Sequence, residues 1–299
     1  MRFAAAILGI VYAAPVCMNA QSAEQPVLLV IAAGTDDCFL AAGGTVASLV
    51  ERGAKAILIR VTNDDKSAWN LSPEEAALRN RQEAEQAGKI LGFQEVISMG
   101  YRAHELADVP FTSLRDRLIL YIRHYRPTVL FIPNPYAEYD RVLDHHYAGR
   151  AAEDAWRSAA IDNYVPPFGA AGVRPHTTAE IYYYAPPLDP RRREPESTAT
   201  FVPQPKTLDI AAVLPRKLRA VQALKTINRA FAMQIKERLD ATGRRLALLD
   251  TVDDASIGKL VEENVRGLAT VAAEGSAFGQ AEQFHFAGVD YQIPSRYRK

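Results

Sequence analysis

Two apolar runs near the start of the chain constrain the fold most strongly. Residues 27–33 (VLLVIAA) and 54–61 (AKAILIRV) are dominated by apolar, mostly branched side chains, which is typical of strands buried on both faces of a sheet. Between them, residues 43–53 (GGTVASLVERG) have helical spacing and end at Gly53, a residue type that commonly stops a helix. A strand, a helix and a strand of these lengths predict a parallel βαβ unit.

The same alternation continues along the chain. Ser72 and Glu75 have the spacing of a capping box, and Pro73 suits a first helical turn. This helix is expected to end near Leu91, where Gly92 follows. The pattern then predicts a short strand at 94–100, a helix at 114–125, a strand at 128–133, a helix after residue 145 and a strand at 179–186. The fold class is therefore α/β with a mainly parallel sheet.

The last third of the chain is expected to be largely helical. A segment rich in proline and arginine, residues 187–205, reads as a surface loop. Helices are predicted at 215–239 and 256–273, and AEQFHF (281–286) reads as a closing strand or loop. Because no change in composition marks a boundary, residues 24–299 are expected to form one domain with a helical C-terminal extension.

The first 23 residues have the pattern of a signal peptide. Arg2 precedes an apolar run at 3–16 that is too short to span a bilayer comfortably, and small residues follow it. The mature chain is expected to begin between Gln21 and Gln25, to be periplasmic or secreted, and to contain no transmembrane segment. A buried N-terminal helix and a lipid anchor on Cys17 are the alternatives.

The balance of charged residues indicates which classes of binding partner are compatible with the chain. The chain has 35 Lys and Arg against 35 Asp and Glu, which argues against a nucleic-acid partner, because phosphate neutralisation needs a clustered positive surface. A neutral or modestly charged small molecule or glycan fits this balance better. Cys17 and Cys38 are the two cysteines, and loss of the first with the leader would leave no internal disulfide.

Two adjacent carboxylates follow the first predicted strand. Asp36 and Asp37 should lie at the carboxyl edge of the sheet, where open α/β sheets bind their ligands. One carboxylate of such a pair can bind a metal while the other accepts a proton from water. Capping of the next helix is an equally good reading of either residue. Gly43 and Gly44 match neither dinucleotide nor P-loop spacing, so they are expected to permit close packing.

A second polar cluster follows the strand predicted at 128–133. Asp144, His145 and His146 should lie at the same edge of the sheet as the first pair of carboxylates. Histidine is a frequent metal ligand, and an Asp and a His from separate turns make up half of an open zinc site. Taken alone, an Asp-His-His run at a helix start is more often a cap with solvated imidazoles.

Several stretches in order resemble the PIG-L or LmbE-like deacetylases. The family's first motif is commonly H-P-D-D-E or H-P-D-D-C followed by G-G-T, and this chain has GTDDC at 34–38 and GGT at 43–45. Further similar stretches, within a likeness from Val27 to Pro186, are RVTNDDKSAW, RNRQEAEQAGKILG, MGYRAHEL, RPTVLFIPNP and LDHHYAGRAAEDA, with FGQAEQFHF a fainter echo.

The resemblance implies a Rossmann-like three-layer fold and a site with one divalent metal, usually zinc. By position, Asp37 and His145 are the metal ligands, and Asp36 is the general base. Asp144 matches the Asp of the second motif and is expected to assist catalysis. Gly34 and Val142 stand where the family has histidines, so metal binding is expected to be weak or absent.

The resemblance also implies the reaction. It predicts hydrolysis of an N-acetyl group from a glucosamine-containing substrate. Relatives have substrate-facing polar groups at the positions of Arg79, Arg81, Tyr101 and Arg102, of which Arg81 and Tyr101 are the candidates for substrate binding. An exported carbohydrate-binding protein that has lost catalysis on the same scaffold is the alternative. A nucleotide-dependent enzyme is disfavoured because the first turn lacks a phosphate-binding fingerprint.

Overall fold

The computed structural model describes residues 25–136, 142–185 and 205–287. The predicted signal peptide and most of the predicted surface loop at 187–205 lie outside these residues. No helix in the described part of the chain is long and apolar enough to cross a membrane.

One seven-stranded sheet in the order β3-β2-β1-β4-β5-β7-β6 forms the centre of the molecule. Strands β1 to β5 are parallel, and β7 is antiparallel to both of its neighbours, β5 and β6. The strands are β1 (Val27–Ala32), β2 (Lys55–Thr62), β3 (Glu95–Tyr101), β4 (Val129–Pro133), β5 (Glu180–Tyr184), β6 (Pro205–Asp209) and β7 (Ala281–Ala287). The mainly parallel α/β fold is confirmed, and β6 was not predicted.

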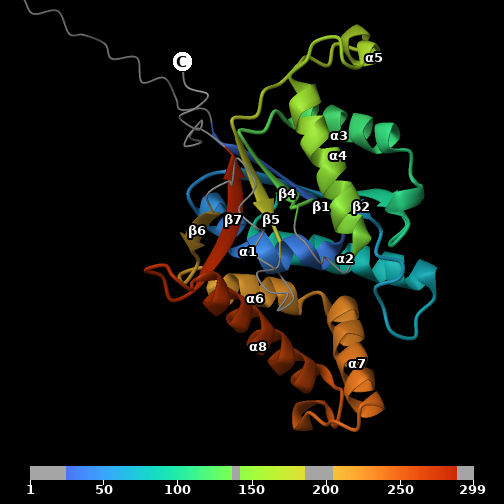
Figure 1. Ribbon diagram of the computed structural model, residues 1–299, viewed down its shortest axis with the longest axis vertical. Coiled ribbons are helices and arrows are strands. Elements are labelled where there is room, and N and C mark those ends of the chain that lie inside the picture. Colours follow the sequence, from blue (N-terminus) through green and yellow to red (C-terminus); the bar gives the residue numbers. More distant parts are fainter. Residues whose placement is uncertain (1–24, 137–141, 186–204, 288–299) are drawn as a thin grey trace, which may run out of the picture.

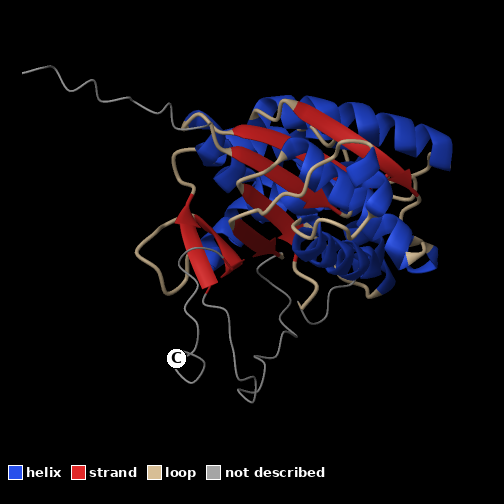
Figure 2. Ribbon diagram, turned by 90° about the horizontal axis from the view of Figure 1, so that it is seen from above, coloured by secondary structure: helices blue, strands red, loops and turns tan. Residues whose placement is uncertain are grey.

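Helices cover both faces of the sheet and make three layers (Figures 1 and 2). Leu28 and Val30 of β1 pack with α1, α6 and α8 on one face, whereas Leu29 and Ile31 pack with α3 and α4 on the other. The helices are α1 (Thr35–Glu51), α2 (Pro73–Leu91), α3 (Phe111–Tyr125), α4 (Leu143–Ala159), α5 (Pro166–Ala170), α6 (Leu214–Gln222), α7 (Lys225–Ala241) and α8 (Asp254–Ala272), with short 3-10 helices at Leu106–Asp108 and Ala247–Leu249.

The first helix begins earlier than the glycines indicate. Helix α1 starts at Thr35, so the carboxylates predicted to lie in a turn occupy the first helical turn instead. Gly43 and Gly44 lie inside α1, where a Cβ on Gly44 would come within 2.8 Å of the Ile210 side chain. These glycines therefore serve close packing, as expected, and do not start the helix.

The helix predicted at 215–239 is in fact two helices. Helix α6 ends at Gln222 and α7 starts at Lys225. The Glu83 carboxylate of α2 accepts hydrogen bonds from the backbone N–H and the hydroxyl of Thr226, both at 2.8 Å, and so caps the first turn of α7. The start of α7 is therefore stabilised by a contact with another helix, which the sequence around residue 225 does not indicate.

Candidate active site

The turns after β1 and β4 meet at the carboxyl edge of the sheet. Asp37 lies in the first turn of α1, and His145 lies in the first turn of α4. Because β1 and β4 are neighbouring parallel strands, both helices start at the same edge. Nε2 of His145 lies 3.6 Å from Oδ2 of Asp37. The predicted convergence of these two residues is confirmed.

Asp37 is held in a buried position. The residue is 4% exposed, and its carboxylate accepts hydrogen bonds from the backbone N–H groups of Ala33 and Cys38, at 3.0 and 2.5 Å. Burial raises the pKa of Asp37 to about 7, although the nearby His145 acts to lower it. Protons therefore compete with any cation for this carboxylate near neutral pH.

Asp36 lies beside Asp37 and is half-buried. Burial raises the pKa of its carboxyl group, and the negative charge of Asp64 raises it further, whereas His145 lowers it. A carboxylate with a raised pKa accepts a proton more readily than an exposed one, which suits a general base. The geometry is thus compatible with the predicted role of Asp36.

Asp64 fills the space next to Gly34, where the family has a histidine. A Cβ on Gly34 would lie 2.9 Å from Oδ1 of Asp64. The backbone of Gly34 is extended, with φ −114° and ψ −175°, so it would admit any residue type. The obstacle to a histidine at position 34 is therefore the Asp64 side chain, not the backbone.

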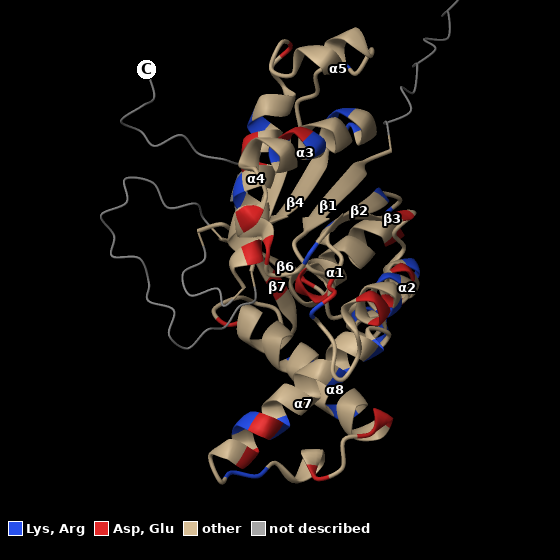
Figure 3. Ribbon diagram, turned by 90° about the vertical axis from the view of Figure 1, so that its right-hand side faces the viewer, with Lys and Arg blue, Asp and Glu red and all other residues tan. Residues whose placement is uncertain are grey.

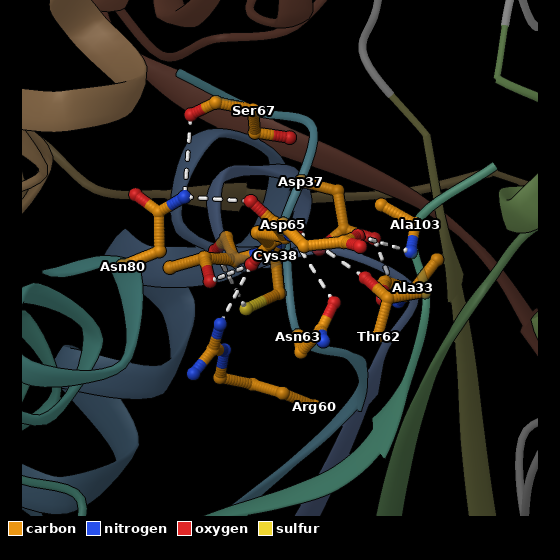
Figure 4. A network of polar contacts seen from close by, with 12 residues as sticks. Ala33, Asp37, Cys38, Arg60, Thr62, Asn63, Asp65, Ser67, Asn80 and Ala103 are labelled. Carbon is orange, nitrogen blue, oxygen red and sulfur yellow. Dashed lines mark hydrogen bonds and ion pairs between the residues drawn. The ribbon is translucent and has the colours of Figure 1, made fainter. Parts of the chain in front are cut away.

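The Asp64 carboxylate is fixed by buried partners. It accepts hydrogen bonds from Nη2 of Arg60 at 2.7 Å, from the backbone N–H of Thr35 at 3.1 Å, and from the Thr35 hydroxyl. Arg60 is 1% exposed, and Figure 4 shows its guanidinium pointing into this network. Neither residue was predicted from the sequence to belong to the site, although Asp64 follows the second predicted strand and so lies at the same edge.

A further residue missed from the sequence is Tyr184, at the end of β5. Its hydroxyl donates to the backbone carbonyl of Ile31 at 2.9 Å, which joins β5 to β1 beneath the site. Burial raises the pKa of Tyr184, and the charge of Asp37 contributes in the same direction. The Tyr184 phenol therefore stays protonated and uncharged next to Asp37.

Asp144, predicted to be catalytic, anchors a neighbouring segment. Its carboxylate accepts hydrogen bonds from the backbone N–H groups of His104, at 2.6 Å, and Leu106, at 3.2 Å. His104 itself has a left-handed backbone, with φ 62°. Through these hydrogen bonds, Asp144 connects the start of α4 to the segment that follows β3. Its catalytic role stays a prediction.

The residues predicted to contact substrate have other side chains as partners. Arg81 is exposed on α2, where its Nε forms an ion pair with Glu85 at 3.0 Å. Tyr101, at the end of β3, packs under the guanidinium of Arg117, with 4.9 Å from Cζ to the ring centroid. The structure shows no contact of either residue with Asp36 or Asp37. Their role in substrate binding stays a prediction.

The described residues do not fit a complete zinc site. No group of three or more His, Cys, Asp or Glu side chains placed to hold a metal ion occurs among them. Asp37 and His145 are two candidate ligands, whereas catalytic zinc sites commonly use three protein ligands. Nδ1 of His146 lies 3.1 Å from the carbonyl oxygen of Pro135, so this imidazole has a partner in the backbone.

Comparisons with known proteins point to the family that the motifs resemble. The PIG-L family model, described as GlcNAc-PI de-N-acetylase, matches residues 29–156. A diacetylchitobiose deacetylase of Thermococcus kodakarensis is 27% identical over 217 residues, covering 71% of this chain and 73% of that protein. The resemblance to the PIG-L deacetylases is confirmed.

Solved structures show the same fold. The N,N'-diacetylchitobiose deacetylase of Pyrococcus horikoshii matches with a TM-score of 0.69 and 22% identity, covering 91% of this chain and 88% of that one. The 4-carboxy-2-hydroxymuconate hydratase of Pseudomonas putida matches with a TM-score of 0.60 and 16% identity, covering 90% and 98%. Because the fold is shared with a hydratase, the reaction must be argued from the site.

Proposed function

We propose, from the PIG-L resemblance and from the site, that this protein is a hydrolase that removes an N-acetyl group from a glucosamine-containing substrate. The observation that carries the proposal is the meeting of Asp36, Asp37 and His145 at one edge of the sheet in the family's motif order. The relative from Thermococcus, a diacetylchitobiose deacetylase, supports the substrate class.

The chemistry follows from the placement of the carboxylates. Asp36 accepts a proton from water while the water oxygen adds to the acetyl carbonyl carbon. Collapse of the tetrahedral intermediate breaks the C–N bond, and the departing nitrogen takes up the proton that Asp36 accepted. The products are acetate and a free amino sugar. In this proposal Asp36 accepts the proton, and Asp37, whose Oδ2 lies 3.6 Å from Nε2 of His145, is left as a candidate ligand for the cation.

The site is proposed to be impaired. The expected cofactor is one divalent cation such as zinc, but Gly34 offers no ligand and the described residues supply two. Weak cation binding would leave the acetyl carbonyl poorly activated, because stabilisation of the developing oxyanion is usually a large part of acyl-transfer catalysis. Slow turnover is therefore part of the proposal.

Acetate release tests the function. Wild-type protein incubated with N,N'-diacetylchitobiose should release acetate slowly, and Asp36→Asn should lower the rate by about 100-fold or more, because a carboxamide cannot accept the proton. Asp240→Asn, an equivalent change at an exposed carboxylate on α7, should leave the rate unchanged. Equal rates for wild type and Asp36→Asn, or no acetate from wild type at high zinc, would contradict the proposal.

A further inference from the structure

A cavity of about 610 Å³ lies outside the site formed by Asp36, Asp37 and His145. Residues from the loop between β2 and α2, from α2, from the start of α7 and from α8 line it. Figure 1 shows α7 and α8 on the same side of the sheet as α2, and Figure 3 shows residues of both charges along α2 and α7. The proposed hydrolysis uses none of the lining residues.

The lining of this cavity has cations without acidic partners. Arg79, Lys225 and Arg229 line it, and none of the three forms an ion pair with any described residue. Glu83 and Asp254 are the acidic lining residues, and both oxygens of Glu83 accept hydrogen bonds from Thr226. The lining therefore has three cationic against two anionic side chains, and the three cations have donors available for an anion.

The remaining lining groups suit a sugar. Trp69 lines the cavity, and an aromatic ring can pack against the apolar C–H groups of a sugar. The side-chain NH₂ groups of Gln222 and Asn228 are already donated to backbone carbonyls, at 3.3 and 2.7 Å. Their amide oxygens are left as acceptors for hydroxyl groups. An aromatic ring, hydroxyl acceptors and guanidinium groups together match a charged saccharide better than a purely apolar ligand.

The loop that contributes Trp69 also borders the candidate active site. Its first residues include Asp64, which contacts Thr35 next to Asp36. Asn80 of α2 is fully buried and donates to the backbone carbonyls of Asp64 and Ser67, at 2.8 and 3.2 Å (Figure 4). One tethered loop thus forms a wall of the cavity and a wall of the site.

We propose that this cavity binds an anionic saccharide, a sugar bearing a phosphate or a carboxylate. Arg79, Lys225 and Arg229 hold the charged group, and Trp69 packs against the sugar ring. The proposal rests on the lining of the cavity and not on the proposed hydrolysis. Sugars without an N-acetyl group are therefore suitable probes, because their binding is independent of deacetylation.

Calorimetric titration of the full chain tests this. Glucose 6-phosphate and glucuronate, which separate the two sources of charge, should bind, and the better of them at least about tenfold more tightly than glucose. Arg229→Gln should weaken that binding by about tenfold. Arg238→Gln removes the same charge from an exposed position on the same helix, outside the lining, and should have no effect.

Trp69→Ala separates a saccharide site from a simple anion site. It should weaken binding of the charged sugar and leave binding of inorganic phosphate unchanged. The proposal is overturned if glucose binds as tightly as both charged sugars, or if inorganic phosphate binds as tightly as glucose 6-phosphate. Equal affinities for Arg229→Gln and Arg238→Gln would also overturn it.

Discussion

Gly34→His alone is expected to leave the affinity for zinc unchanged and to lower the stability of the protein. The triple variant that combines Gly34→His with Asp64→Gly and Arg60→Met should raise the affinity for zinc by about 100-fold or more. The single variant fails because its Cβ would lie 2.9 Å from Oδ1 of Asp64, which the buried Arg60 holds in place. Asp64→Gly removes the obstacle, and glycine suits a backbone with φ 56°.

The third change, Arg60→Met, is needed to keep the protein folded. Loss of Asp64 alone would leave the buried Arg60 guanidinium without its carboxylate, and an unpaired buried charge commonly costs about 3–5 kcal/mol. An apolar side chain of similar length avoids that cost. The regained imidazole would join Asp37 and His145 as a third ligand.

The control for this prediction is Arg60→Met with Asp64→Gly, which lacks the new histidine. Zinc titration by calorimetry should show weak binding for the control and tight binding for the triple variant, with melting curves to show that both are folded. Zinc binding by Gly34→His as tight as by the triple variant would show that Asp64 is not the obstacle.

Glu282→Gln is expected to lower the free energy of unfolding by about 3–5 kcal/mol, because it leaves the ammonium group of Lys217 without a charged partner in the core. Lys217 and Glu282 are 1% and 3% exposed, and Nζ lies 2.8 Å from Oε1. The same carboxylate accepts hydrogen bonds from the backbone N–H groups of Gly44 and Thr45. The pair therefore joins β7 and α6 to α1, the helix that presents Asp36 and Asp37.

Urea unfolding measures this effect, with Glu262→Gln as the matched control. Glu262 pairs with Arg266 on the exposed face of α8, and such exposed pairs contribute at most about 1 kcal/mol. Adding Lys217→Met to Glu282→Gln should recover part of the lost stability, since the buried cation is then absent. Equal midpoints for the two Glu→Gln variants would contradict this account of the core.

Local chemistry made parts of the fold predictable. The Ser72–Glu75 capping box and the left-handed Gly92 at the end of α2 occur as expected, because side chains within one turn determine both. The start of α7 was not predictable, because Glu83 caps it from another helix. Strand β6 was missed for a related reason: its residues are only half-buried and its pairing with β7 is long-range.

The candidate site likewise contains residues that could be predicted from the sequence and residues that could not. Strand order places Asp37 and His145 together, since both follow neighbouring parallel strands. The sequence does not reveal that the Asp64 side chain occupies the space next to Gly34, because the two residues belong to different turns that meet only in the folded protein. Arg60 was not predicted to belong to the site, because it lies in an apolar run that is typical of a buried strand.

Zinc titration of the wild-type protein, purified without chelator, determines whether the metal site is incomplete. We expect substoichiometric zinc after purification and weak binding that strengthens as the pH rises through about 7, because Asp37 must lose its proton to bind. Stoichiometric, tightly held zinc that is lost in Asp37→Ala or His145→Ala would show that another residue supplies the missing ligand, and would contradict the claim that the metal site is incomplete.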